Sequence, residues 1–297
     1  MIEQNNNLKF ALFGNLYQEK KAVAVQKFLA VAERHKVELA IQAEFHDFLV
    51  NNLQITVPQC EIIEDDNFQA DFVVCMGGDG TFLNVASQVK DKEIPIIGFN
   101  TGRLGFLASF SPENIEDTIT DICSGNYTVN NHAVLQASMK GAELGLVPFA
   151  LNEVALLKHD ISSMISIHTT INGEYLTTYM ADGLIIGTPT GSTAYSLSVG
   201  GPIVVPEGNI ITLTPVAPHS LNMRPIVLTD SSEVELTVQS RSGSFLVAID
   251  GRSQSYPDNI VISVKKADYV VKVVTKQGQS FFSTLRRKMM WGADSRG

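Results

Sequence analysis

The sequence predicts an α/β domain with a parallel sheet, followed by an all-β sandwich domain. Strands and helices alternate in the first part of the chain, and short strands separated by Gly, Pro, Asn and Asp fill most of the rest. With 297 residues, 44% of them hydrophobic, the chain is long enough for two cores. We therefore expect domains at residues 1–125 and 126–275 and a terminal segment at 276–297.

The first domain is predicted from hydrophobic periodicity. A helix near 19–35 carries its apolar residues mostly on one stripe, and the strand expected at 71–76 is apolar from Phe72 onward, as in a strand buried on both faces. Strand–helix alternation of this kind is typical of a parallel sheet covered by helices on both faces. The expected elements are strands at 8–14, 37–41, 71–76 and 94–99 and helices at 19–35, 81–89 and 111–122.

The second domain is predicted from turn signals. Asn172-Gly173 lies between two runs rich in Thr, Ile and Tyr, which is the strongest short-range signal of a hairpin. Many short strands of this kind favour a sandwich or a two-sheet stack. Further strands are expected at 183–189, 209–215, 225–229, 233–238, 244–250 and 259–264.

The end of the chain predicts one more helix, at 281–292. A helix does not belong inside a sandwich, so we expect it to cover the first domain and to bury its large apolar side chains there. The basic cluster 286–288 is expected on the exposed face of this helix, near the end that favours cations.

Composition excludes several function classes. A formal net charge of −9 without a long basic run argues against a nucleic acid or an anionic membrane as partner. The N-terminus shows no signal-peptide pattern and no apolar run reaches the length of a membrane span, so we expect a soluble, cytoplasmic protein. Three cysteines without C-x-x-C spacing predict neither a zinc site nor a disulfide framework.

The turn after the strand at 71–76 is the first candidate site. It reads "GGDGT", so Gly77, Gly78 and Gly80 surround Asp79. The turn can be a tight strand-to-helix connection, where glycine adopts positive φ without strain, or a phosphate cradle at the carboxyl end of a parallel sheet. Asp79 favours the cradle, since an acid there can bind Mg²⁺ or accept a proton from an attacking hydroxyl. Neither G-x-G-x-x-G nor the P-loop pattern is present.

"GGDGT" is similar to the signature shared by diacylglycerol and sphingosine kinases, 6-phosphofructokinases and NAD kinases. Further stretches resemble the NAD kinase family in order and spacing: "GFNTGRLGFL", "LNEVAL" and "DGLIIGTPTGSTAYSLSVGGP". The resemblance implies transfer of the ATP γ-phosphoryl group to the 2′-hydroxyl of the adenosine ribose of NAD, giving NADP. It also implies Mg²⁺ or another divalent metal, a Rossmann-like N-terminal domain to which the last segment returns, and a homotetramer or homodimer.

The resemblance also implies roles for particular residues. Asp79, with Gly80 beside it, matches the acid that contacts the 2′-hydroxyl, and Asn152-Glu153 matches the pair that holds ribose hydroxyls and adenine. Asp182 matches an acid that reaches adenine, often from a neighbouring subunit. The loop that packs on the dinucleotide corresponds to Thr193, Ala194, Tyr195 and Ser196.

The ATP phosphates are expected at the amides of Gly77 and Gly78, with Asn100 and Arg103 nearby. His219 and Asp250 match shorter motifs, and the metal-binding residues stay unassigned. Several of these residues also have an explanation that involves no ligand. Asn152-Glu153 can be a polar strand edge, Tyr195 a core residue, His219 a loop residue and Arg103 a solvated cation.

Two other functions remain open from the residues alone. One is a lipid or sugar kinase of the same superfamily, although no basic amphipathic stretch for a membrane surface is present. The other is a non-catalytic NAD(P)-binding regulator, and the presence of Asp79 argues against it. Turnover with ATP and NAD distinguishes the three.

Overall fold

The computed structural model describes residues 8–15, 22–102, 105–160, 163–278 and 280–291. The chain divides into two compact units. The first unit comprises Met1–Asn131 and Val271–Gly297, and the second comprises His132–Val270. Within the described ranges, no helix combines the length and apolar character that crossing a membrane requires.

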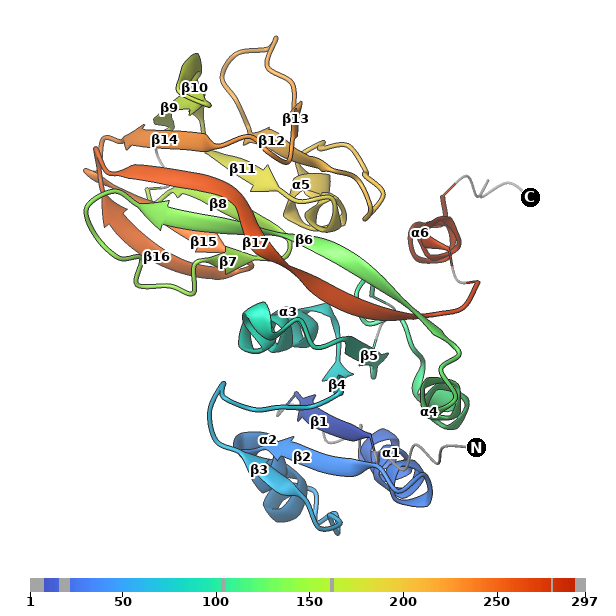
Figure 1. The fold of residues 1–297 in the computed structure, drawn as a ribbon. Helices are drawn as coiled ribbons and strands as arrows, with labels where there is room; N and C mark the ends of the chain where they lie inside the picture. The colour runs from blue at the N-terminus through green and yellow to red at the C-terminus, as the bar shows by residue number, and fades with distance from the viewer. Residues whose placement is uncertain (1–7, 16–21, 103–104, 161–162, 279, 292–297) are drawn as a thin grey trace. The chain divides into compact units, whose positions relative to one another are not determined.

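The first unit is built on a parallel sheet with the strand order β3-β2-β1-β4-β5 (Figure 1). The last part of β17 (Val261–Lys276) adds to β5 in parallel, with Val273 opposite Ile96. The five strands are β1 (Lys9–Gly14), β2 (Glu38–Gln42), β3 (Glu61–Ile63), β4 (Phe72–Gly77) and β5 (Ile96–Asn100). The predicted α/β domain with a mostly parallel sheet is confirmed.

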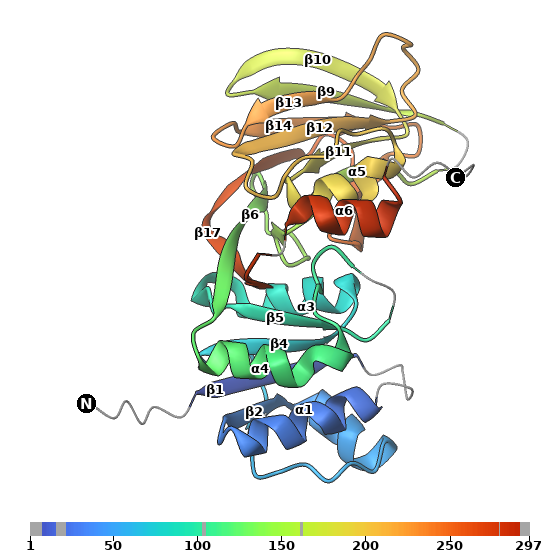
Figure 2. The same ribbon diagram turned by 90° about the vertical axis from the view of Figure 1, so that its right-hand side faces the viewer.

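Helices cover both faces of this sheet. On one face, Phe28 of α1 and Ile119 of α4 share a core with Leu12 and Val74, and Figure 2 shows α1 and α4 side by side. Phe82 of α3 packs on the opposite face, where a Cβ at Gly98 would lie 3.0 Å from its ring. The helices are α1 (Ala22–Arg34), α2 (Ala43–Asp47) with a π-helical turn at Phe48–Asn52, α3 (Asp79–Val89) with a 3₁₀ turn at Lys90–Lys92, and α4 (Ile115–Cys123) after a 3₁₀ turn at Pro112–Asn114.

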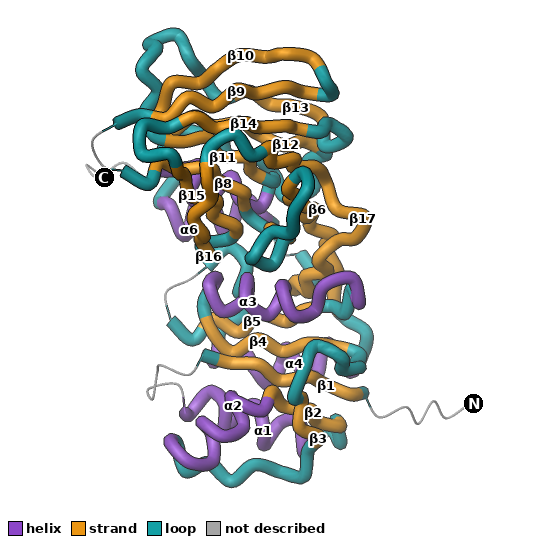
Figure 3. The backbone as a smooth tube through the Cα atoms, turned by 90° about the vertical axis from the view of Figure 1, so that its left-hand side faces the viewer, coloured by secondary structure: helices purple, strands orange, loops and turns teal. Residues whose placement is uncertain are grey.

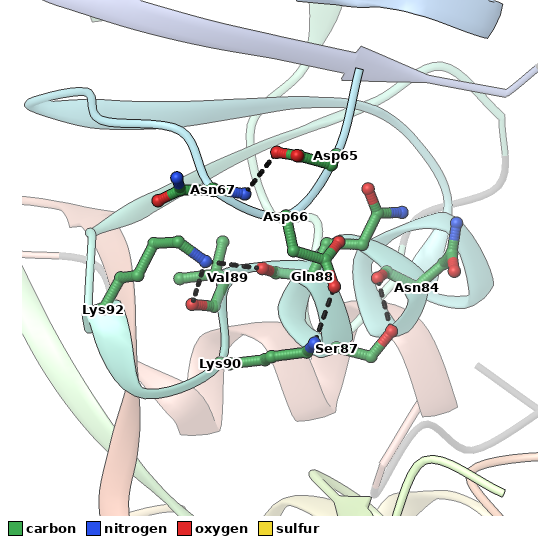
Figure 4. A network of polar contacts seen from close by, with 9 residues as sticks. All are labelled: Asp65, Asp66, Asn67, Asn84, Ser87, Gln88, Val89, Lys90 and Lys92. Carbon is green, nitrogen blue, oxygen red and sulfur yellow. Dashed lines mark hydrogen bonds and ion pairs between the residues drawn. The ribbon is translucent and has the colours of Figure 1, made fainter. Parts of the chain in front are cut away.

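The C-terminal end of α3 is tied to the loop before β4 (Figure 4). Lys90 Nζ lies 2.6 Å from Asp66 Oδ2, and Lys92 Nζ donates to the carbonyl oxygens of Gln88 and Val89 at 3.1 and 3.4 Å. Cations at this end of a helix interact favourably with its dipole. These contacts fix the far end of the helix whose first residue is the candidate catalytic acid.

The second unit consists of two antiparallel sheets that pack face to face (Figure 3). One has the order β10-β9-β14-β17, with β6 on β17 and β7 on β6; the other has the order β13-β12-β11-β8-β15-β16. Ile167 and Leu236 from the first sheet share one core with Ile186 and Phe245 from the second. The strands are β6 (Tyr127–Met139), β7 (Phe149–Ala150), β8 (Glu153–Lys158), β9 (Ile165–Ile171), β10 (Glu174–Ala181), β11 (Gly183–Gly187), β12 (Ile210–Val216), β13 (Ile226–Thr229), β14 (Val234–Gln239), β15 (Ser244–Ile249) and β16 (Arg252–Pro257).

The predicted hairpin and sandwich are therefore confirmed. Asn172 and Gly173 join β9 to β10 with φ values of 51° and 81°, as a tight hairpin turn requires. A 3₁₀ turn at Thr190–Thr193 and the short helix α5 (Tyr195–Ser198) follow β11.

The boundaries between the two units fall inside strands and not at loops. β6 and β17 each run from one unit into the other, so the division falls at 131/132 and 270/271, whereas the sequence led us to expect 125/126 and 275/276. A strand continues its alternating pattern across such a boundary, so turn residues and changes in composition mark only the ends of the strand.

The last helix, α6 (Phe281–Met289), belongs to the first unit, as expected. Leu285 is 8% exposed, and the Phe281 ring lies 6.2 Å from the Phe106 ring. The expectation that all its large apolar side chains are buried is wrong, since Phe282 is 56% exposed and Trp291 58%. The helix is short, and only one side of it faces the unit.

We expect Leu285→Ala to lower the unfolding free energy of the first unit by about 2–5 kcal/mol, because it removes a buried side chain and leaves a cavity. Phe282→Ala, on the exposed side of the same helix, should change it by less than about 0.5 kcal/mol. Urea titrations of the two full-length variants measure the difference. Equal effects would mean that α6 does not stabilise the unit through the Leu285 contact.

Candidate active site

In the first unit, a strand turns into a helix without an intervening loop. β4 ends at Gly77, Gly78 precedes the helix in an extended conformation, and Asp79 is the first residue of α3. None of the turn glycines has a positive φ. A Cβ at Gly77 would lie 2.3 Å from the Thr81 hydroxyl oxygen, whereas a Cβ at Gly78 or Gly80 would meet no atom within 4 Å. Neither conformation nor packing requires glycine at 78 and 80, which leaves close approach of a ligand as the physical reason.

The Asp79 carboxylate is held by backbone amides. The N–H of Phe106 donates to Oδ2 at 2.9 Å, and the N–H groups of Leu107 and Ala108 donate to Oδ1 at 3.1 and 3.2 Å. A Cβ at Gly105 would lie 1.9 Å from Oδ1, so only glycine lets this loop reach the acid. Lys288 of α6 adds a cation, with Nζ 3.6 Å from Oδ2.

A cavity of about 600 Å³ begins near the same edge of the sheet. Asn100 lines it; this residue ends β5 opposite Gly77 and accepts the Gly102 N–H at 2.8 Å. Lys276 and Arg287 supply cations to its wall, and Asp117 and Asp121 of α4 supply carboxylates. The cavity therefore offers donors and acceptors to a polar molecule of nucleotide size. Arg103 lies outside the described residues.

In the second unit, a hairpin turn holds the start of β8. Asp250, at φ 47°, joins β15 to β16. Its carboxylate accepts the backbone N–H groups of Leu151, Asn152 and Glu153 at 2.7, 2.9 and 3.1 Å. Burial raises the pKa of Asp250 in spite of these hydrogen bonds. Asp250 thus fixes the backbone of the Asn152-Glu153 pair.

Glu153 is a buried acid that is not fully satisfied. The residue is 8% exposed, and its Oε2 atom has no hydrogen-bond partner among the described residues. Burial and the nearby Asp250 carboxylate raise the pKa of Glu153 to about 7, although a hydrogen bond from the Tyr195 backbone N–H acts in the opposite direction. A buried, unsatisfied carboxyl oxygen of this kind is typical of a group that binds a ligand.

The segment 188–196 packs directly on Asn152. Thr188 Oγ1 donates to the Leu151 carbonyl at 2.6 Å and accepts the Gly191 N–H at 3.0 Å. A Cβ at Gly191 would lie 2.1 Å from the Asn152 carbonyl oxygen. The conformation of this loop and the position of the Asn152-Glu153 pair are therefore coupled.

Within this loop, some polar residues are structural. Ser196 is fully buried and shares a hydrogen bond of 3.0 Å with Thr214. Thr193, Ala194 and Tyr195 are only partly buried, so part of each is accessible to a ligand. His132 of β6 also supports the loop, through a 2.8 Å hydrogen bond between Nδ1 and Thr190 Oγ1, and burial lowers its pKa to about 4.

Asp182 does not join this group. It precedes β11, and Glu153 pairs with Gly187 at the other end of that strand, about 17 Å away for five residues of extended chain. Asp182 Oδ1 lies 2.7 Å from Lys158 Nζ. His219 is exposed, and its N–H donates to the Met180 carbonyl at the same end of β11 as Asp182.

The predicted residues thus form one group in the first unit, around Asp79, and another in the second, around Glu153. Sequence reasoning missed Lys288, Gly105 and His132. Gly105 lies in the quoted "GFNTGRLGFL" stretch, so its motif was visible. Lys288 is exposed, as the sequence predicts, but no local pattern indicates its approach to Asp79 or distinguishes it from its basic neighbours.

Comparisons with known proteins agree over nearly the whole chain. The ATP-NAD kinase N-terminal domain family matches residues 13–127, and the ATP-NAD kinase C-terminal domain family matches residues 151–276. The NAD kinase of Bacteroides fragilis is 54% identical over 289 residues, which are 97% of this chain and 100% of that protein. The NAD kinase of Porphyromonas gingivalis is 40% identical over 286 residues, 96% of this chain and 98% of that protein.

Two solved structures are also similar. Yeast NADH kinase, crystallised with NADH, aligns with a TM-score of 0.87 at 25% identity and covers 98% of this chain and 90% of its own. An NAD kinase from Archaeoglobus fulgidus, in complex with ATP, aligns with a TM-score of 0.73 at 25% identity, over 95% and 99% of the two chains.

Proposed function

Since this chain belongs to the NAD kinase family, we propose that it transfers the γ-phosphoryl group of ATP to the 2′-hydroxyl of the adenosine ribose of NAD, giving NADP. The observation that carries the proposal is the turn at Gly77–Gly80: an acid beside two glycines that leave open space where a phosphate can approach. Identity of 54% over 97% of the chain supports the same reaction.

We assign the first unit to the phosphoryl donor. Phosphoryl transfer requires mainly alignment and charge neutralisation. The amides at Gly77 and Gly78 would hold the terminal phosphates, with Asn100 and Arg103 nearby. The 600 Å³ cavity that begins at Asn100 has the size for the rest of the nucleotide, and Lys276 and Arg287 suit phosphate oxygens.

We assign the second unit to the dinucleotide. Glu153 and Asn152 would hold the ribose hydroxyls and adenine, and the free Oε2 of Glu153 supports this role. Thr193, Ala194, Tyr195 and Ser196 would pack on the dinucleotide, and Asp250 would act by fixing the backbone of the Asn152-Glu153 pair. His219, in the loop after β12, lies at the Asp182 end of β11 and would contribute beside Asp182.

Asp79 is assigned to the nucleophile. Gly80 beside it leaves room for the ribose, and the carboxylate would accept a hydrogen bond from the 2′-hydroxyl. As the O2′–P bond forms and the bond from phosphorus to the bridging oxygen breaks, the hydroxyl proton passes to the Asp79 carboxylate. The electron pair of the broken bond stays on ADP.

A divalent cation such as Mg²⁺ is proposed to accompany ATP. Among the described residues, no three His, Cys, Asp or Glu side chains gather as a metal-binding group. Mg²⁺ in nucleotide enzymes is held chiefly by the substrate phosphates and one or two carboxylates, which fits the single acid at the glycine turn. The ion would supply charge neutralisation at the triphosphate. Activity should be lost in EDTA and return with added Mg²⁺.

We further propose a cytoplasmic homotetramer or homodimer in which Asp182 completes a neighbour's dinucleotide site. Asp182 and Glu153 lie at opposite ends of β11, about 17 Å apart, so one chain does not present both to the same part of a ligand. A second copy of the chain can supply the missing acid. Neither a nucleic acid nor a membrane is proposed as a partner.

Asp182→Ala should raise the KM for NAD about tenfold and leave the KM for ATP within about twofold, because a hydrogen bond to a charged group contributes about 1.5–3 kcal/mol. Mixing this variant with an inactive Asp79→Asn protein, with subunit exchange proven, should restore activity through mixed oligomers. Proven mixed oligomers without recovered activity would exclude a composite site.

The proposed reaction is tested with the purified protein, Mg-ATP and NAD, and an enzyme that responds only to NADP as the readout. Formation of NADP at a rate proportional to protein supports it. Diacylglycerol and fructose 6-phosphate serve as competing acceptors, and a preference for either would indicate another kinase of the superfamily. Tight NAD binding without any turnover would indicate a non-catalytic regulator.

A further inference from the structure

The last helix places one cation against the acid of the glycine turn. Lys288 Nζ lies 3.6 Å from Asp79 Oδ2, and the two side chains are 31% and 32% exposed. The same Nζ lies 4.3 Å from the centroid of the Phe106 ring. Phe106 also contributes the N–H that donates to Asp79 Oδ2, so one residue positions both the acid and the cation.

Lys288 is distinct from the two arginines that precede it. Successive residues of a helix point about 100° apart, so the three cations face three directions. All three residues are exposed, but Arg287 lines the cavity and Arg286 does not. Only Lys288 reaches Asp79, and it does so from an element that the sequence places at the other end of the chain.

A phosphate group can readily replace the Asp79 carboxylate as the partner of the Lys288 ammonium. A carboxylate has about four acceptor positions, and three of those of Asp79 are taken by N–H groups of residues 106–108. Lys288 stands near the remaining one. An ion pair this exposed contributes less than about 1 kcal/mol, so an arriving phosphate group with two negative charges competes well for the ammonium. The Phe106 ring keeps the cation close when it leaves the acid.

We propose that Lys288 is a catalytic residue of the phosphoryl transfer: it covers Asp79 in the free enzyme and moves to the γ-phosphate of the bound donor. The move opens the last acceptor position of Asp79 to the attacking hydroxyl and places a positive charge where the transferred group gains negative charge. Lys288 gives up no proton; the hydroxyl proton goes to Asp79, and the electron pair of the broken bond goes to the bridging oxygen of ADP.

Lys288→Met tests the proposal, because methionine keeps the aliphatic length and removes the charge. We expect kcat to fall about 10- to 100-fold, at or below the lower end of what loss of one preorganised donor costs, because Lys288 is partly exposed to solvent. The Kd for NAD and the melting temperature should stay unchanged. Lys288→Arg should recover at least a third of the lost activity, and Arg286→Met, the same charge change on the same helix, should keep wild-type kcat.

A binding measurement separates this inference from the proposed reaction on which it rests. In calorimetric titrations, the wild type should bind Mg-ATP more tightly than Mg-ADP, and Lys288→Met should lose most of that preference while its affinity for ADP stays the same. This result would support the γ-phosphate contact even if NAD proved not to be the acceptor. An unchanged ATP-to-ADP preference, wild-type kcat in Lys288→Met, or an equal loss in Arg286→Met would overturn the proposal.

Discussion

Asp79→Asn should lower kcat about 10²- to 10⁴-fold and leave the Kd for NAD within about threefold of the wild type. Asparagine has the size of aspartate and can hydrogen-bond a hydroxyl, but it cannot accept the proton, and loss of a general base typically costs this much. An NADP-specific assay gives kcat, and calorimetric titration gives NAD affinity.

The structure adds a cost in stability to this variant. The carboxylate accepts three backbone N–H groups, and an amide group must turn its NH₂ toward at least one of them. We expect a loss of about 1–3 kcal/mol in the unfolding free energy of the first unit. Wild-type kcat would remove Asp79 from the chemistry. Lost NAD binding together with a melted first unit would assign the residue a structural role instead.

Glu153→Gln should stabilise the second unit at pH 8 and weaken NAD binding. Burial and Asp250 raise the pKa of Glu153 to about 7 in the folded protein, compared with 4.5 for the ordinary side chain. Keeping this acid ionised above pH 7 therefore costs the folded state about 3 kcal/mol, and glutamine avoids that cost. If Glu153 holds the ribose as proposed, glutamine at this position should raise the Kd for NAD about 10- to 100-fold.

The pH dependence distinguishes this cause from a packing effect. The folded state holds the proton more tightly than the unfolded one, so the wild type loses stability as pH rises from about 4.5 to about 7 and stays at the lower level above that. The stabilisation by Glu153→Gln should thus be near zero at pH 4 and reach its full size by pH 8. Calorimetric melting across this range measures it, with the exposed Glu207→Gln as a control variant. A gain that is equal at both ends of the range would mean that ionisation is not the cause.

Much of this fold can be predicted from the sequence because the signals for its elements are local. The stripe of α1, the continuous apolar run of β4 and the Asn172-Gly173 turn each predict their element from a few neighbouring residues. Site residues can be predicted where they form a rare local motif, as in the glycine turn around Asp79. The apolar patterns of β6 and β17 say nothing about where one unit ends, since a strand looks the same on both sides of a boundary.

Other parts of the site depend on contacts between distant segments. The closeness of Gly105 to Asp79, the support that His132 gives to Thr190 and the approach of Lys288 exist only once separate elements have packed. The raised pKa of Glu153 depends likewise on burial and on Asp250 from another hairpin. No spacing within a single stretch encodes these contacts, so they become visible only in three dimensions.

The first unit is assembled from both ends of the chain, with Val271–Gly297 returning after the whole of the second unit. Synthesis on the ribosome makes residues 132–270 before the end of β17 that adds to β5 and before the helix that carries Lys288. Asp79 is therefore synthesised early and Lys288 near the end of translation. A nascent or prematurely terminated chain has a glycine turn without its lysine, and the Asp79–Lys288 ion pair is complete only when translation has nearly ended.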